Sequence, residues 1–362
     1  MSHENIQMHN GKFFPETKNE LVELVRDYDV HLGSIDTSRI TDMSCLFCDA
    51  ERKDYFGIET WDTSHVVNMQ RMFENATSFN QQIAAWDVSS VENMGCMFAY
   101  AKSFNQPIAS WDVSHVKKMD GMFMHAKSFN QQIAAWDVSR VKDMFCMFEN
   151  AKSFNQPLDS WDVSNVKNMS YMFQGDEMFN QPLDSWNVSR VEDMRGMFAD
   201  ATSFDQPLER WDVSSVENMS YMFHRATSFN QPLRSWDVSN VKDMFCMFMG
   251  AESFHQPLES WVEKNLATFR KQRVPPKPSS HADKKYSYYF IAARYALCTT
   301  FDSLARFIAE EMARDGNDRK KIEAVLSKSE EPALLACGKK FMDSKEFKTI
   351  LKDAVKSKND GR

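Results

Sequence analysis

Nine tryptophans at a constant spacing of 25 residues constrain the fold of this chain more than any other feature. They are the only tryptophans among its 362 residues: Trp61, Trp86, Trp111, Trp136, Trp161, Trp186, Trp211, Trp236 and Trp261. Self-similarity at a fixed period of about 20 to 50 residues is the signature of an architecture in which one structural unit is stacked many times. We therefore treat residues 35–261 as one array and not as several globular domains.

The spacing of apolar residues changes within each repeat. Trp86 and Val88 alternate as in a short strand, and the apolar residues that follow take the spacing of a helical turn, which Ser89 can cap. Because so small a unit cannot bury its own apolar stripe, we expect the repeats to stack, with each strand pairing in parallel with the next. The tryptophans then form a buried column; an exposed aromatic platform for carbohydrate is the alternative.

Two polar columns follow the same period. Asn80, Asn105 and Asn130 each precede a glutamine, which predicts a ladder of amides that satisfies backbone groups at a corner. An aspartate follows most of the tryptophans, and at strand spacing such a column places like charges about 5 Å apart. Hydrogen bonds to turn amides would offset this repulsion, and so would bridging cations.

The unit W-D-V-S-x-V-x-x-M-x-x-M-F-x-x-A-x-S-F-N-Q-x-L resembles the 25-residue repeat first catalogued as a domain of unknown function in Mycoplasma lipoproteins, which is grouped with BspA-like leucine-rich-repeat surface proteins. The resemblance covers residues 35–261. It implies an α/β solenoid, a leucine-rich-repeat-like right-handed coil with one short parallel strand and one short helical turn per repeat. It also implies a binding or structural surface without catalysis. Relatives of these repeats in large DNA viruses are a further comparison.

We expect five segments along the chain. Thr17 and Glu20 form a capping box, which predicts a helix at residues 17–27 that covers the first repeat. The stretch VPPKPSSHADKK is typical of a linker. The predicted segments are an N-terminal capping segment with this helix (1–34), the solenoid of about nine turns (35–261), a C-terminal capping helix (262–273), a linker (274–285) and a small all-α module (286–362).

The net charge of -8 is unevenly distributed. Residues 262–362 hold 22 Lys and Arg against 14 Asp and Glu, and the residues before them hold 21 against 37. Such a split indicates that the two parts attract each other or recruit partners of opposite charge. A predicted helix in the tail carries four lysines on one face, either a solvated face or a docking face for an acidic surface, nucleic acid or anionic membrane: Lys345, Lys348, Lys352 and Lys356. No recognised nucleic-acid motif accompanies them.

Candidate contact residues are those that differ from repeat to repeat. The least uniform positions lie four, six, nine, thirteen and fourteen residues after each tryptophan, and one repeat supplies the examples Arg140, Lys142, Phe145, Glu149 and Asn150. Asp176 stands where the other repeats have alanine. We interpret this exception as drift or a local bulge, with a binding residue as the alternative.

The residues that carry enzyme chemistry are not arranged in any motif that we recognise. Cys45, Cys96 and Cys146 share one column and lie two repeats apart, about 10 Å at strand spacing, so a disulfide between them is excluded and we expect free thiols in a reducing compartment. No phosphate-binding loop, dinucleotide motif, zinc-protease motif or nucleophile elbow is present. We expect no catalytic residue, cofactor or metal site.

These observations lead to one functional hypothesis and two alternatives. The sequence predicts a non-enzymatic scaffold that mediates protein–protein interaction through variable solenoid positions and a basic helical tail. The alternatives are a structural or minor component of a large virus particle and a surface adhesin. The first 20 residues lack the pattern of a secretory signal, and no apolar run approaches about 18 residues. We therefore expect a location inside a cell or a virus particle, with surface exposure left open.

Overall fold

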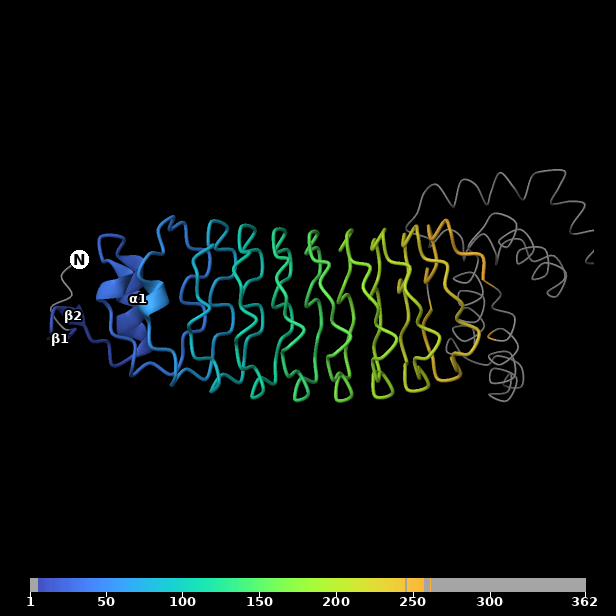
Figure 1. Ribbon diagram of the computed structural model, residues 1–362, viewed down its shortest axis with the longest axis horizontal. Helices are drawn as coiled ribbons and strands as arrows, with labels where there is room; N and C mark the ends of the chain where they lie inside the picture. The colour runs from blue at the N-terminus through green and yellow to red at the C-terminus, as the bar shows by residue number, and fades with distance from the viewer. Residues whose placement is uncertain (1–5, 245, 257–260, 262–362) are drawn as a thin grey trace, which may run out of the picture.

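The computed structural model describes residues 6–244, 246–256 and 261. Successive 25-residue units stack along one axis, and the array runs away from the N-terminal end as a series of similar coils (Figure 1). This is a repeat fold, as the spacing of the tryptophans predicts. The predicted C-terminal capping helix, linker and helical module lie outside the described residues, and so do the four tail lysines Lys345, Lys348, Lys352 and Lys356.

Short elements cover the N-terminal end of the array. Strands β1 (Met8–His9) and β2 (Lys12–Phe13) pair antiparallel, and helix α1 (Lys18–Arg26) follows. The Thr17 side chain accepts the amide of Glu20 while the Glu20 side chain accepts the amide of Thr17, so the predicted capping box and helix are confirmed. The apolar face of α1 is buried in the core that it shares with the first repeat. Two single-turn 3₁₀ helices follow, η1 (Leu32–Ser34) and η2 (Ile58–Thr60).

Neither the strand nor the helical turn that we expected in each repeat is present in the described array. Successive repeats are joined by isolated parallel bridges, and these lie seven residues after the tryptophan, in the segment that we expected to be helical. The residues at this position are Asn68, Asn93, Lys118, Asp143, Asn168, Asp193, Asn218 and Asp243, with Asp42 before them. The strand expected at Trp86–Val88 is wrong, because the pairing surface is on another part of the coil.

The backbone conformation explains this difference. Two residues in each repeat have a positive φ, ten and fourteen positions after the tryptophan; in one repeat they are Cys146 (54°) and Asn150 (55°). The left-handed residues at positions ten and fourteen prevent the chain from continuing as a helix. Alternate backbone amides of this segment therefore point to the next repeat. The amides of Met144, Cys146, Phe148 and Asn150 donate to carbonyl oxygens of the following repeat over 2.6 to 3.0 Å. We call the surface formed by positions seven to fourteen the ladder wall.

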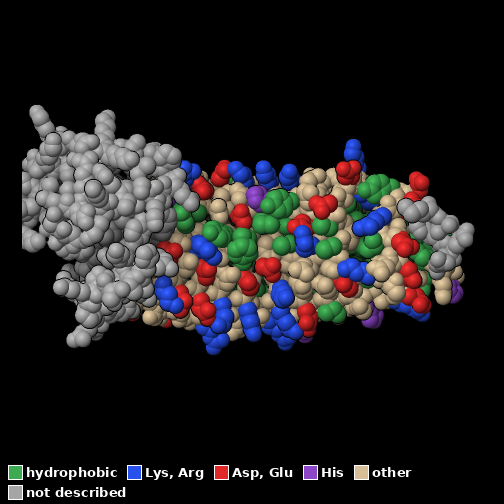
Figure 2. Space-filling model, turned by 180° about the vertical axis from the view of Figure 1, so that it is seen from behind, with side chains coloured by type: hydrophobic (Ala, Val, Ile, Leu, Met, Phe, Trp, Pro, Cys, Tyr) green, Lys and Arg blue, Asp and Glu red, His purple; other side chains and the backbone are tan. Residues whose placement is uncertain are grey.

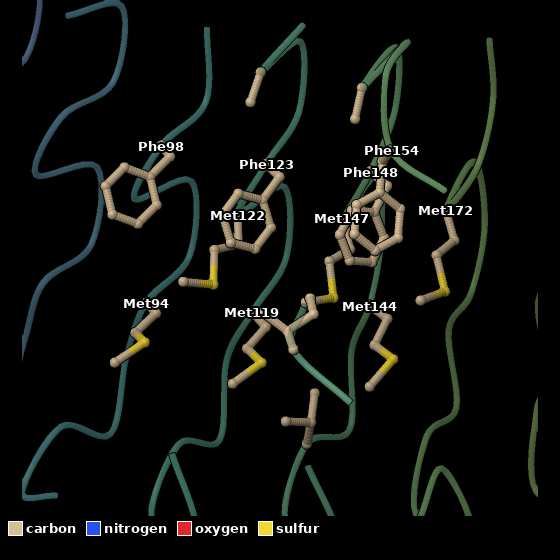
Figure 3. Packing of buried hydrophobic residues seen from close by; sticks show 14 of the residues in the cluster. Met94, Phe98, Met119, Met122, Phe123, Met144, Met147, Phe148, Phe154 and Met172 are labelled. Carbon is tan, nitrogen blue, oxygen red and sulfur yellow. The ribbon is translucent and has the colours of Figure 1, made fainter. Parts of the chain in front are cut away.

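The interior consists of columns of identical side chains. Each tryptophan ring is at most 4% exposed, and the rings of Trp111 and Trp136 lie parallel with their centroids 6.4 Å apart. The indole N–H of Trp111 donates to the carbonyl oxygen of Ile83 over 3.2 Å. Phenylalanine and methionine columns repeat beside them, as Phe98 and Phe123 show in Figure 3 with centroids 5.7 Å apart. The tryptophans are therefore core residues and not a carbohydrate platform.

The two polar columns are satisfied by hydrogen bonds between and within repeats. The Asn105 side-chain oxygen accepts the amide of Asn130 and the Nε2 group of Gln131, both at 2.9 Å, so the predicted amide ladder is confirmed. In the aspartate column, Asp162 accepts the amide of Ser164 over 3.0 Å, and hydrogen bonds from this serine lower the pKa of its carboxyl. Of the two ways to offset repulsion that we considered, hydrogen bonds to turn amides are present.

Candidate functional site: the ladder wall

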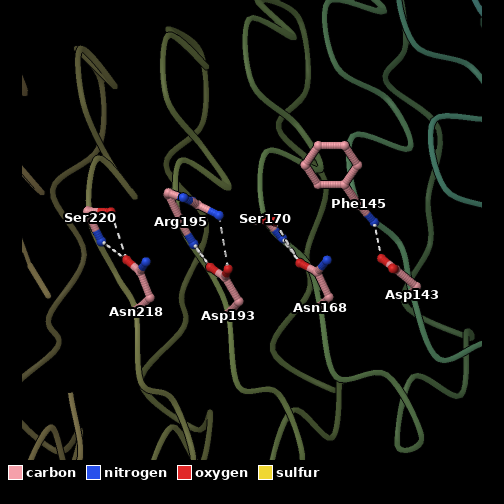
Figure 4. Close-up of polar contacts among 8 residues, drawn as sticks. All are labelled: Asp143, Phe145, Asn168, Ser170, Asp193, Arg195, Asn218 and Ser220. Carbon is pink, nitrogen blue, oxygen red and sulfur yellow. Dashed lines mark hydrogen bonds and ion pairs between the residues drawn. The ribbon is translucent and has the colours of Figure 1, made fainter. Parts of the chain in front are cut away.

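The ladder wall presents its variable side chains on a fixed backbone. Asp143 and Asp193 accept the amides of Phe145 and Arg195, two residues later, each over 2.9 Å (Figure 4). Asn168 and Asn218 make the same bond in the repeats between and beyond them. These turns hold Phe145 and Arg195, nine positions after the tryptophan, where they reach solvent, whereas Ser170 and Ser220 at the same position are buried. The methionines and phenylalanines beside them point into the core.

Three consecutive repeats place an aromatic and arginine cluster on this wall. Phe145 is 39% exposed, and its ring meets the ring of Tyr171 edge to face with the centroids 6.1 Å apart. The guanidinium of Arg195 lies 5.4 Å from the centroid of the Tyr171 ring, within the range of a cation–π interaction. The same guanidinium pairs with Asp193 over 3.3 Å. We call Phe145, Tyr171 and Arg195 the wall cluster.

A second aromatic contact lies on the N-terminal side of the wall cluster. The rings of Tyr100 and His125 stack with their centroids 4.5 Å apart, and His125 Nε2 lies 3.7 Å from a carboxylate oxygen of Glu149. Burial lowers the pKa of His125, so the imidazole is neutral at pH 7. The contact is therefore mainly a packing contact and not an ion pair.

Glycines in the wall make room for large side chains of the preceding repeat. The ring of Tyr171 lies over Gly196, where a Cβ atom would collide with it, and Gly196 has a φ of 59°. The side chain of Asn150 lies over Gly175 in the same way. Large wall side chains thus lie over the next repeat. A glycine at the position beneath them leaves room for the side chain and tolerates the positive φ of that position.

The structure divides the predicted contact residues into two groups. Phe145, Glu149 and Asn150 belong to the ladder wall, whereas Arg140 and Lys142 are exposed at positions that precede it. At the position of Lys142, cross-repeat ion pairs occur in other repeats, such as Lys117 with Glu92 (2.8 Å), Lys167 with Glu192 (2.6 Å) and Lys242 with Glu217 (2.6 Å). The contact role of all five residues stays a prediction.

Sequence reasoning missed the role of the position ten residues after each tryptophan. We interpreted the cysteines of this column only as free thiols and gave the column no contact role. The structure gives its residues a left-handed backbone and places Tyr171 and Tyr221 half-exposed on the wall. The signal was available, since this column alternates among Arg, Cys, Gly and Tyr while the core columns hardly change.

One family matches the chain over most of the array. Residues 18–136, 106–204 and 178–273 match the family described as "Mycoplasma protein of unknown function, DUF285". Together these matches cover more than half of the chain. The chain belongs to this family. The match confirms the resemblance that the W-D-V-S unit carries, while a relation to viral repeats stays a prediction. Comparisons with curated proteins and with solved structures gave no match.

In this DUF285 array, Asp176 is neither part of a bulge nor a surface residue. The amide of Asp176 donates to Phe173 over 3.1 Å, as the amide of Ala151 donates to Phe148 over 2.9 Å, so the backbone is regular and the predicted bulge is wrong. The side chain is 0% exposed, because the alanine column in which it stands faces the core. Its alternative assignment as a surface contact is therefore also wrong.

The cysteines that the structure describes are free thiols. Burial raises the pKa of Cys96 to about 11, and burial together with hydrogen bonds to Asp49 and Glu74 raises the pKa of Cys48 to about 12. Neither thiol is a nucleophile at neutral pH. In the described part of the chain, no group of three or more His, Cys, Asp or Glu side chains is placed to hold a metal ion, and no helix has the length and apolar character to cross a membrane.

A cavity of about 450 Å³ lies between the loop after α1 and the first repeat. Tyr28 and Phe56 line its rim, and Arg52 lines it as a buried residue. Arg52 Nη2 donates to the carbonyl oxygens of Asp27 (3.3 Å) and Val30 (3.1 Å). These bonds tie the loop to the first repeat, which gives Arg52 a structural role at the N-terminal end of the array.

Proposed function

We propose that this protein is a non-enzymatic scaffold whose ladder wall binds other proteins. The observation that carries the proposal is the contrast between uniform core columns and variable wall columns, with Phe145 exposed and Tyr171 and Arg195 half-exposed beside it on the wall. Aromatic residues and arginine are enriched in protein interfaces and supply most of the binding energy in them. A space-filling view of one face shows apolar side chains in separate patches among charged ones (Figure 2).

The rigidity of the wall supports the same proposal. Four backbone hydrogen bonds join the wall segment to that of the next repeat in most of the described repeats, for example those donated by Met169, Tyr171, Phe173 and Gly175 over 2.7 to 2.9 Å. Because these side chains stand on a fixed backbone, a partner that binds them orders little additional chain. We propose further that the array is a right-handed solenoid of the leucine-rich-repeat kind, with the ladder wall in place of its parallel strands.

The basic tail is the second contact region in this proposal. Residues 262–362 carry 22 Lys and Arg against 14 Asp and Glu, in contrast to the acidic array. Charge of this sign favours association with acidic surfaces. Lys345, Lys348, Lys352 and Lys356 are the residues that we expect to take part.

The test is a comparison of two triple variants of the full chain. Phe145→Ser, Tyr171→Gly and Arg195→Ser remove the wall cluster, and each new residue already occupies the same repeat position elsewhere, as Ser170, Gly196 and Ser220 show. The matched control is Asp159→Ala, Asp184→Ala and Arg210→Ser, outside the wall, again with residues that the array uses at those positions. In affinity capture from source cells, we expect the wall variant to lose partners that the wild type and the control retain. Equal capture by both variants contradicts the proposal.

A further inference from the structure

One column of the core contains a single exception. Fifteen residues after each tryptophan the array has a buried alanine, and these alanines are at most 1% exposed. The members of the column are Ala76, Ala101, Ala126, Ala151, Ala201, Ala226 and Ala251. Asp176 takes this place in the repeat at residues 161–185 and is 0% exposed. An ionisable group therefore lies where the packing elsewhere accepts only a methyl group.

The carboxyl group of Asp176 has no polar partner among the described residues. Neither of its oxygens accepts or donates a hydrogen bond. The one charge that acts on it is the carboxylate of Glu177, which is repulsive and is itself paired with Lys152 at the surface over 2.5 Å. Of the titratable residues near this position in the adjacent repeats, Glu149 and Asp200 are acids, and the one cation, Lys152, is paired with Glu177. No cation compensates a negative charge at this point.

We propose that Asp176 is a pH-dependent weak point, at which rising pH opens the stack around the repeat at residues 161–185, including its contact with the repeat at residues 186–210. A carboxylate without a partner is not stable in a dry core, so the packed state holds the proton. Once the contact opens and water reaches the group, it ionises near its ordinary pKa of about 3.9. Each pH unit above that value favours the open state about tenfold until the packed state itself loses the proton.

The repeat architecture keeps such an opening local. Each repeat contacts only its neighbours, so one contact can separate while the blocks on either side stay stacked. The opening breaks the ladder bonds from Phe173 to Met197 (2.9 Å) and from Gly175 to Ala199 (2.7 Å). Those bonds join the repeats that carry Tyr171 and Arg195, so the opening also separates these two residues of the wall cluster.

The experiment is amide hydrogen exchange on the full chain between pH 4.5 and pH 7, with rates expressed as protection factors to remove the intrinsic pH dependence of exchange. In the wild type, the protection factors of the Phe173 and Gly175 amides are expected to fall about tenfold per pH unit. The equivalent amides of Phe98 and Tyr100, which bond Met122 and Met124, serve as the internal reference and stay level.

Three variants separate ionisation from packing. Asp176→Ala restores the residue of the column and should give level protection factors at Phe173 and Gly175. Asp176→Asn keeps a buried polar group that cannot ionise. Its protection factors at Phe173 and Gly175 should be independent of pH, at a level equal to or lower than that of Asp176→Ala. Asp159→Ala, at an exposed aspartate, should behave as the wild type. A wild type without pH dependence, or the same slope in Asp176→Asn as in the wild type, overturns the proposal.

Discussion

The core columns and the ladder wall are made by the same 25 residues but tolerate change very differently. Position twelve after the tryptophan is phenylalanine in every described repeat, whereas position nine holds Gln, Gly, Asp, Phe, Ser and Arg. A core side chain packs between two copies of itself, so a change in one repeat meets unchanged neighbours on both sides. Side chains at position nine such as Phe145 and Arg195 reach solvent. Uniformity is thus imposed by stacking, and variation marks the surface that is free to acquire contacts.

The largest expected difference between the two regions is the effect of truncating an aromatic side chain. Trp136→Ala removes a ring that stacks on Trp111 (6.4 Å) and contacts Phe123 (6.3 Å), and it should lower the free energy of unfolding by about 3 to 5 kcal/mol. Phe145→Ser, on the wall, should change it by less than about 0.5 kcal/mol. Urea unfolding of both variants measures this. Similar losses for the two would show that core and wall are not distinct.

Asp176 breaks the rule for the core, so removing it should stabilise the protein. Burial raises the pKa of Asp176 well above its ordinary value, so its contribution to stability decreases as pH rises above the unfolded pKa. Asp176→Ala should increase the free energy of unfolding, and the gain should grow by about 1.4 kcal/mol for each pH unit between pH 4.5 and pH 7. Urea unfolding at both pH values tests the sign. A gain that grows toward acid pH contradicts this assignment.

Within the wall, a glycine that supports a large neighbour should be sensitive to substitution. Gly196→Ala places a Cβ atom against the ring of Tyr171 at a φ of 59°, and we expect a loss of about 1 to 2 kcal/mol. In the background of Tyr171→Gly the collision is absent and only the backbone cost remains. A double-mutant cycle measures the difference. Strict additivity would mean that the ring does not lie over this glycine.

The smallest expected effect concerns the amide ladder. The Asn155 side chain accepts the amide of Asn180 and the Nε2 group of Gln181, each over 3.0 Å, so Asn155→Ala should cost about 1 kcal/mol. The control Asp159→Ala changes an exposed side chain to the residue that Ala109 and Ala134 already show at that position, and it should have less effect. Thermal unfolding of the pair compares them. Equal melting temperatures of the two variants would show that the amide ladder does not stabilise the protein.

The stacked array, the buried tryptophans and the capping helix could be predicted because each follows from side-chain pattern. The local backbone could not. Apolar spacing indicates which side chains point inward. A helical turn and the observed backbone of the ladder wall both place Met94, Met97 and Phe98 in the core, so this spacing does not distinguish between them. The left-handed positions are often occupied by residues other than glycine, for example Cys146 and Asn150, so glycine marks them only in some repeats, as at Gly121 and Gly196.

Variation among the repeats predicted part of the candidate site. The same variation was misleading at a position that the fold buries. Phe145, Glu149 and Asn150 lie on the wall because variable positions are solvent-facing. Asp176 is equally exceptional in the sequence, yet it is buried, because a comparison among repeats detects a departure without telling which side of the coil accommodates it. Tyr171 was missed because position ten was not among the positions that we identified as least uniform.

The central claim is that equivalent residues of successive repeats stack on one another. It is tested most directly by deleting one whole repeat and, in a second variant, only part of a repeat. Deletion of residues 111–135 joins Ser110 to Trp136 and leaves every column aligned, whereas deletion of residues 111–122 joins Ser110 to Phe123 and shifts all later columns. Near-ultraviolet circular dichroism of the tryptophans reports their packing. The full-repeat deletion should keep the signal per tryptophan and unfold cooperatively in urea, and the partial deletion should lose the signal. Loss of the signal in both deletions, or its retention in both, would contradict a core of stacked, interchangeable repeats.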